Sequence, residues 1–174
     1  MCSLETYQID LKGMKTGEQR LEFDVDGDFF KALDTSEVKD GVLHVSVSIR
    51  KATGFYELQF HTEGTVTVPC DLCLDDMEQP IVTDNRLVAK LGAETNTEDD
   101  DVVTVDENEG ILDTSWLIYE FIALAIPIKH VHAPGKCNSV MTQKLQELSG
   151  ADLRGEEEVK EIDPRWEKLK NLKV

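Results

Sequence analysis

The stretch DGVLHVSVSIR, residues 40–50, alternates apolar and polar side chains almost without interruption. Every second residue from Leu43 to Ile49 is apolar, which predicts a β-strand with one face on a hydrophobic core. The alternation resumes after Gly54 and continues through residues 55–70. Asp40-Gly41 and Gly54 are turn signals at the two ends of the first strand. The pattern therefore predicts an antiparallel hairpin or meander at the centre of the fold.

Shorter patterns on both sides of this hairpin predict the other elements. Alternating or strand-like runs lie at residues 7–12, 21–26, 81–91 and 102–105. Asp28 is expected to cap a short helix, and Asp113 is expected to cap the main helix, which Pro127 ends. The apolar residues of this main helix, within 116–125, cover more than one face. We therefore expect the helix to be largely buried against the sheet.

Together these elements predict a single α+β domain over residues 1–150, in which an antiparallel β-sheet packs against one main helix. The acidic segment 94–101 has almost no apolar content and is expected to be a solvated loop. Residues 151–174 are expected to form a polar connector and a C-terminal amphipathic helix. The sequence leaves open whether this terminal part is mobile.

The formal charge of −17, from 35 acidic and 18 basic residues, restricts the possible partners. Nucleic acids are bound largely through Lys and Arg at their phosphates, so a surface this acidic would repel them over most of its area. Basic proteins would be attracted to it. No signal-peptide pattern opens the sequence, and the apolar run at 116–128 is too short to cross a bilayer. We therefore expect a cytoplasmic protein without a membrane partner.

Three of the four cysteines, together with two histidines, have the spacing of a metal site. Cys70 and Cys73 form a Cys-x-x-Cys pair, which can bind one Zn²⁺ if a second segment supplies an imidazole and a third thiolate. The expected structural zinc ligands are Cys70, Cys73, His132 and Cys137. His130 remains an alternative ligand because it shares one face of an extended segment with His132, although His132 is closer to Cys137 in sequence.

Other interpretations of the cysteines remain possible. They can be small buried hydrophobic residues, as Cys often is. Thioredoxin-like redox chemistry fits less well, because it needs a Cys-x-x-Cys that opens a helix in a βαβ unit, and this pair ends an antiparallel strand. The sequence contains no nucleophile elbow and no His-Glu-x-x-His motif, so we expect neither an enzyme nor a small-molecule substrate.

The C-terminal residues form a basic segment on an acidic chain. Asp163-Pro164 is a helix start signal, and large apolar residues follow it at helical spacing. Residues 165–173 contain four basic residues and one acidic residue. Such a helix can bind a protein partner or dock on its own domain, and its charge would permit local contact with RNA. The residues expected to make these contacts are Arg165, Trp166, Leu169 and Leu172.

Several of these features occur in a characteristic order. They are VPCDLCL at 68–74, an acidic loop, a helix ending in LAIP at 124–127, His132 five residues before Cys137, and DPRW at 163–166. In this order, over roughly residues 60 to 172, the chain resembles the YceD-type family of large ribosomal RNA subunit accumulation proteins. Two positions depart from the family pattern. Asp71-Leu72 stands where the family often has a basic residue, and His130 stands where it commonly has proline.

The resemblance implies a cytoplasmic, non-enzymatic factor that supports accumulation of large-subunit rRNA and therefore ribosome biogenesis. Combined with the acidic charge, it leads us to expect binding of a ribosomal protein or a large-subunit assembly factor, with only indirect or local contact with rRNA. The first alternative is a zinc-containing module that binds RNA directly. A thiol oxidoreductase is the second and less consistent alternative.

Overall fold

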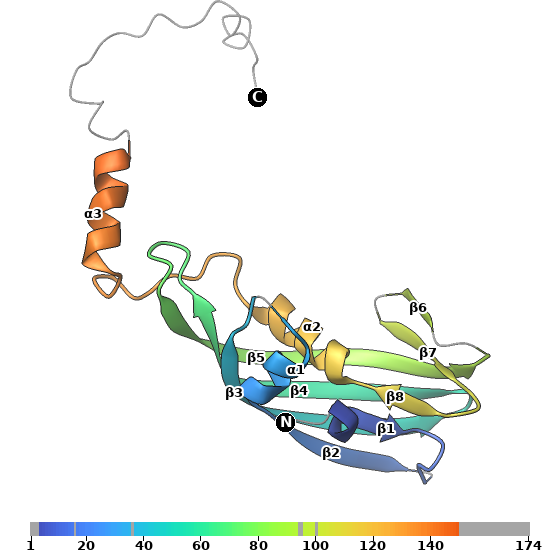
Figure 1. Ribbon diagram of the computed structural model, residues 1–174. Helices are drawn as coiled ribbons and strands as arrows, with labels where there is room; N and C mark the ends of the chain where they lie inside the picture. Colours follow the sequence, from blue (N-terminus) through green and yellow to red (C-terminus); the bar gives the residue numbers. More distant parts are fainter. Residues whose placement is uncertain (1–3, 16, 36, 94–95, 100, 150–174) are drawn as a thin grey trace, which may run out of the picture. The chain divides into compact units, whose positions relative to one another are not determined.

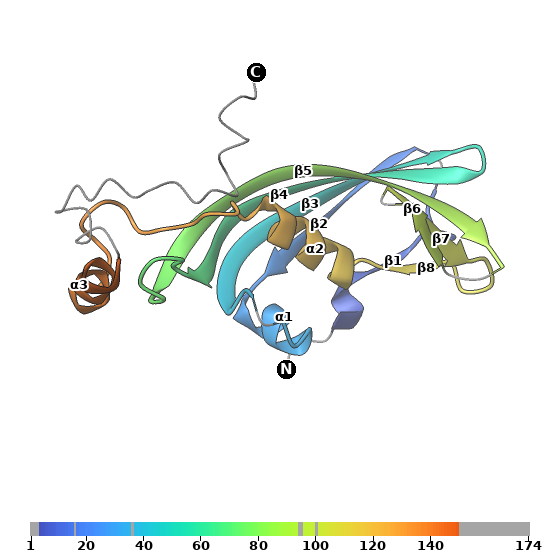
Figure 2. The ribbon, with the colours of Figure 1, turned by 90° about the horizontal axis from the view of Figure 1, so that it is seen from above.

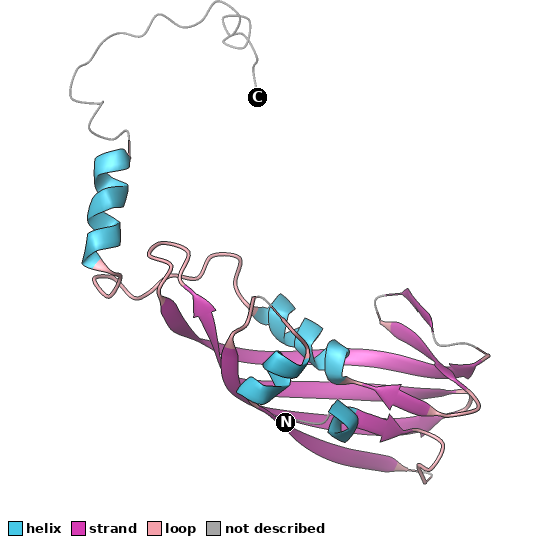
Figure 3. Cartoon of the chain, viewed as in Figure 1, coloured by secondary structure: helices cyan, strands magenta, loops and turns pink. Residues whose placement is uncertain are grey.

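The computed structural model describes residues 4–149 except for 16, 36, 94–95 and 100; for residues 96–99 only the backbone is described. A six-stranded sheet forms its centre, in the order β2-β3-β4-β5-β7-β6 (Figure 1). Its strands are β2 (Glu18–Val25), β3 (Asp40–Ala52), β4 (Phe55–Pro69), β5 (Asp76–Gly92), β6 (Asn96–Asp99) and β7 (Val102–Asp106). A second sheet pairs β1 (Gln8–Asp10) with β8 (Ile111–Asp113). The helices, cyan in Figure 3, are a 3₁₀ turn (Leu4–Tyr7), α1 (Gly27–Ala32), α2 (Ser115–Ala125) and α3 (Ser139–Leu148).

The predicted central hairpin is confirmed as β3 and β4, which pair antiparallel from Asp40↔Thr67 to Ala52↔Phe55. The alternating apolar residues from Leu43 to Ile49 are at most 2% exposed, so this face is the core face. The expected turn at Asp40-Gly41 is wrong, because both residues already belong to β3. β4 extends to Pro69, so it offers pairing partners for these two residues as well.

The predicted α+β class is confirmed, but the sheet is not purely antiparallel. β5 and β7 pair parallel, from Val88↔Val102 to Gly92↔Asp106. The acidic segment between them was expected to be a loop, and that expectation is wrong for residues 96–99. These residues form β6, which pairs antiparallel with β7 at the edge of the sheet. Edge strands tolerate charged residues, so apolar alternation could not reveal this strand.

The helices α1 and α2 cover the same face of the six-stranded sheet (Figure 2). In α2, Ile118 and Ile122 are fully buried, and the ring of Phe121 lies 5.2 Å from that of Phe60 on β4. Trp116 and Leu124, however, are 57% and 76% exposed. The expectation of a largely buried helix is therefore confirmed for the residues that pack against the core and wrong for Trp116 and Leu124.

The N-terminal caps of α1 and α2 differ in detail from expectation. Asp26, rather than Asp28, caps α1, and its Oδ1 accepts hydrogen bonds from the backbone N–H of Asp28 and Phe29. The N-cap of α2 is Thr114, whose hydroxyl instead donates to the carbonyl of Tyr7. Asp113 still stabilises this helix start, since its Oδ1 accepts from both the backbone N–H and the hydroxyl of Ser115.

The chain divides into two compact units, Met1–Cys137 and Asn138–Val174. In the second unit, the side chain of Asn138 caps α3 by accepting from the N–H of Val140, and no residue of α3 is buried. The predicted boundary at residue 150 stays a prediction. Within the part of the chain that is described, no helix has the length and apolar character needed to cross a membrane.

Candidate metal centre

The Cys-x-x-Cys motif forms the tight turn that joins β4 to β5, residues 70–75. Two backbone hydrogen bonds close this turn, from the N–H of Cys70 to the carbonyl of Asp75 and from the N–H of Leu74 to the carbonyl of Cys70, each 2.9 Å long. Leu74 takes a left-handed backbone conformation with φ of 63°. Cys70 and Cys73 are at most 1% exposed, so the turn directs both thiols inward.

A second segment of the chain reaches this turn because α2 ends before Pro127. Ile126 is already extended, as expected for a residue before proline. The segment then pairs with the turn through two reciprocal hydrogen bonds. The N–H of Asp71 donates to the carbonyl of His130 (3.0 Å), and the N–H of His130 donates to Oδ2 of Asp71 (2.7 Å). These bonds hold the two segments side by side.

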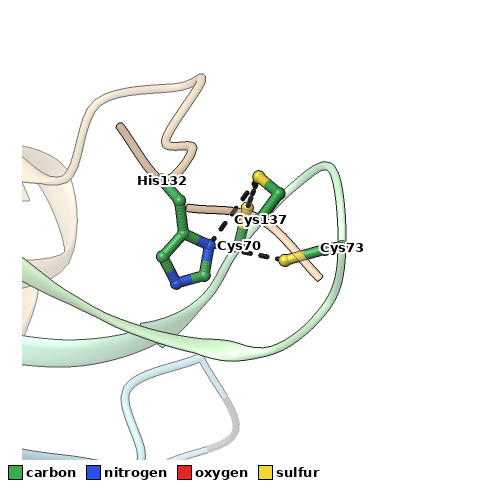
Figure 4. Close-up of side chains that lie close together, drawn as sticks. All are labelled: Cys70, Cys73, His132 and Cys137. Carbon is green, nitrogen blue, oxygen red and sulfur yellow. Dashed lines mark hydrogen bonds between the residues drawn. The ribbon is translucent and has the colours of Figure 1, made fainter. Parts of the chain in front are cut away.

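The pairing brings the four expected ligands together (Figure 4). Sγ of Cys73 lies 3.4 Å from Nδ1 of His132, and Sγ of Cys137 lies 3.9 Å from the same nitrogen. Sγ of Cys70 lies 4.0 Å from Sγ of Cys137. All four donor atoms lie within 4.8 Å of one another, so they could hold one metal ion.

These spacings fit a tetrahedral ion with sulfur and nitrogen ligands. Bonds of about 2.3 Å to sulfur and about 2.0 Å to nitrogen give tetrahedral edges of about 3.8 Å between sulfurs and about 3.5 Å between sulfur and nitrogen. The spacings from 3.4 to 4.0 Å already match these edges. Any longer spacing, up to 4.8 Å, would shorten by no more than about 1.3 Å on binding.

The surroundings of the thiols shift their pKa values in opposite directions. Burial tends to raise the pKa of Cys70, but backbone N–H groups of Cys73, His132 and Leu72 and the imidazole of His132 lower it to about 6. Burial and the neighbouring sulfurs of Cys70 and Cys73 raise the pKa of Cys137 to about 11. One thiolate therefore forms readily, and further deprotonation requires a compensating positive charge.

His130, the alternative ligand, has other partners. Its Nδ1 lies 2.9 Å from the carbonyl oxygen of Pro127, and its Nε2 lies 3.6 Å from Oδ1 of Asp71. It is not part of the four-residue group found among the described residues. The expected partner-binding residues, Arg165, Trp166, Leu169 and Leu172, lie outside the described residues.

Sequence reasoning missed the role of Asp71. This residue appeared only as a departure from the family pattern, yet its main chain and carboxylate hold the His130 segment against the turn. The two departures noted in the sequence, an acid between the cysteines and a histidine before His132, are in contact with each other. Considering them as a pair could have suggested this contact.

These observations define a class of protein, an α+β domain in which a hairpin turn and the segment after the main helix share a Cys₃His cluster. The family model described as "Large ribosomal RNA subunit accumulation protein YceD" matches residues 58–173. The match covers two thirds of the chain, which therefore belongs to this family and confirms the resemblance seen in the sequence. Comparisons with curated proteins and with solved structures gave no match.

The family name gives the broad functional context. It associates the chain with accumulation of the large ribosomal RNA subunit, and it describes an accumulation factor rather than an enzyme. The Cys-x-x-Cys lies between two antiparallel strands and opens no helix. This position differs from the arrangement that thioredoxin-like chemistry uses.

Proposed function

We propose that this protein assists assembly of the large ribosomal subunit, or stabilises its rRNA, by binding a basic protein partner and without catalysing a reaction. The observation that carries this proposal is the combination of the family match with a net charge of −17. An acidic surface repels rRNA phosphates but attracts basic ribosomal proteins, which must be kept soluble until they join rRNA. Such a factor acts in the cytoplasm.

The Cys₃His cluster has a structural role in this proposal. Cys70, Cys73, His132 and Cys137 would hold a Zn²⁺ ion, which prefers this donor set and needs no further ligand in a structural site. The ion would supply a cross-link between the β4–β5 turn and the segment after α2. The fit of the donor spacings to a tetrahedral ion supports this assignment.

The test of the functional proposal is affinity capture of the tagged full chain from growing cells, with and without RNase treatment. We expect basic ribosomal proteins or large-subunit assembly factors to remain bound after RNase. Recovery of rRNA alone, with every protein lost after RNase, would contradict a protein-binding mechanism. Depletion of the protein should also lower the amount of large-subunit rRNA relative to small-subunit rRNA.

Direct RNA binding is the second candidate, because residues 165–173 carry a local charge of +3. In this case Arg165 and Trp166, with Leu169 and Leu172 on the same predicted helix, would contact rRNA instead of a protein. A gel-shift assay at low salt separates the two candidates. Tight rRNA binding that is lost when Arg165, Lys168, Lys170 and Lys173 are changed to Ser would favour this second function.

A further inference from the structure

A groove with an apolar floor lies between the start of α2 and the strands β7 and β8, away from the Cys₃His cluster. Its cavity volume is about 440 Å³. Buried residues of the two strands, Val103, Val105 and Leu112, form the floor. Ile111 and Trp116 form the walls and are 45% and 57% exposed. We call this feature the α2 groove.

The rim of the α2 groove is acidic. Glu109 and Asp113 both line it. The wider segment has the same charge, because residues 91–128 contain ten acidic residues and no lysine, arginine or histidine. More than half of the net charge of −17 therefore comes from this one segment. Lys12 contacts this segment, because its ammonium donates to the carbonyl of Asn108.

Trp116 is placed to contact a ligand. Its indole ring packs against Tyr119 with the ring centroids 5.3 Å apart, so one neighbour orients it while over half of its surface remains exposed. Tryptophan is among the residues that contribute most at protein interfaces, and its face attracts Arg and Lys. An exposed tryptophan beside an apolar floor and acidic rim is complementary to a segment that is both basic and apolar.

We propose that the α2 groove binds a basic peptide segment of a protein partner, with one large apolar side chain on the floor and Lys or Arg residues on Trp116, Glu109 and Asp113. This inference rests on the proposed function and gives it a binding surface. Charge complementarity selects the occupant, because the acidic rim disfavours nucleic acids and acidic peptides. The apolar floor in turn disfavours a purely polar basic segment.

The test uses the isotope-labelled full chain and a short synthetic peptide that carries one tryptophan between paired lysine and arginine residues. We expect NMR shift changes centred on Ile111, Trp116 and Leu117. Trp116→Ala and Glu109→Gln should each weaken binding, Trp116→Ala by about tenfold. Leu124→Ala and Glu120→Gln are matched controls, because both residues are exposed on the same helix and neither lines the groove. They should leave binding unchanged.

Two results would overturn this assignment. The first is that a peptide with serine in place of the tryptophan binds as tightly as the original peptide, and that the NMR shift changes spread along residues 91–128. This result would mean that the peptide is attracted by charge alone. The second is occupation by the chain's own C-terminal residues, which would appear as a change in the Trp116 signals of the free protein when Trp166 is changed to Ala.

Affinity capture separates failure of the groove from failure of the proposed function. If wild type and Trp116→Ala retain the same basic proteins after RNase in equal amounts, the groove assignment is wrong and the protein-partner function remains. If wild type retains none, the proposed function itself is wrong. If Trp116→Ala loses the basic proteins that wild type retains, and Leu124→Ala keeps them, the result supports both the groove assignment and the proposed function.

Discussion

Leu74 has a backbone conformation that favours glycine, with φ of 63° directly after the Cys-x-x-Cys. A left-handed conformation costs a non-glycine residue roughly 1–2 kcal/mol, and the Leu74 side chain, 67% exposed, recovers little of this through packing. We expect Leu74→Gly to leave the free energy of unfolding unchanged or raise it by up to about 1 kcal/mol, whereas Leu74→Val should lower it. Chemical denaturation measures both.

The neighbouring Leu72 is the control for this prediction. It is 45% exposed in the same turn and has no positive φ. There, glycine should destabilise the fold relative to valine. If the glycine variant is more stable than the valine variant at both Leu72 and Leu74, or less stable at both, backbone strain at Leu74 does not explain the stabilities.

Glu57 points away from the core face of β4, yet its side chain is only 7% exposed. Two guanidinium groups cover it: Arg50 donates to its Oε2, and Arg86 lies 2.6 Å from its Oε1. The hydrogen bond from Arg50 is the main cause that holds the pKa of Glu57 below its ordinary value, against the opposing effect of burial.

This lowered pKa predicts an acid-sensitive contribution to stability. The contribution is complete above the unfolded-state pKa and is lost as pH falls through the lower folded-state pKa. Wild type should therefore lose more unfolding free energy than Glu57→Gln between about pH 5 and pH 3. The control is Glu63→Gln on the same strand, where the carboxylate is 61% exposed. Equal acid sensitivity of wild type and Glu57→Gln would contradict the prediction.

At the level of secondary-structure elements, the β4–β5 hairpin and the segment after α2 are joined at the Cys₃His cluster. If zinc is bound there, it closes a loop between Cys73 and His132 as a covalent cross-link would. Removal of the zinc should therefore lower the free energy of unfolding by about 3 kcal/mol or more. Elemental analysis of protein purified without a metal column should find about one zinc per chain. Zinc far below this ratio would contradict the assignment.

Cys137→Ser should reproduce the effect of metal removal. Cys2→Ser is the matched control, because Cys2 is the fourth cysteine of the sequence and has no part in the ligand spacing formed by Cys70, Cys73 and Cys137. Thermal unfolding with and without a chelator compares the two variants. We expect the chelator to destabilise wild type and Cys2→Ser, and to leave Cys137→Ser unchanged.

The elements also show what the sequence could predict. Alternation predicted β3 and β4 because each has one buried face, and ligand spacing predicted the four residues that meet at the cluster. The edge strand β6 was missed because its residues have no apolar period. The parallel pairing of β5 and β7 depends on the path of the chain, which local patterns do not contain. The exposure of Trp116 was missed because an apolar helix face looks the same in sequence whether or not something covers it.

For the whole molecule, the net charge of −17 should determine how partner binding responds to salt. The Debye length falls from about 10 Å at 0.1 M salt to about 3 Å at 1 M, so attraction between the acidic surface and a basic protein should weaken over this range. Measuring retained protein in affinity capture at increasing salt tests this. Binding that is unchanged or stronger at high salt would indicate an interface dominated by apolar contacts.

Cys137 is the last residue of the first compact unit, and Asn138, which caps α3, follows it directly. With a metal bound, tension applied to the C-terminal part of the chain would pass through the Cys137 sulfur and the ion to the tip of the β4–β5 hairpin. Residues 133–136 would be shielded from that load, because the ion also holds His132. The centre would therefore act as a mechanical clamp, which would divide a pull from a partner bound beyond residue 137 between the β4–β5 hairpin and the segment that follows α2.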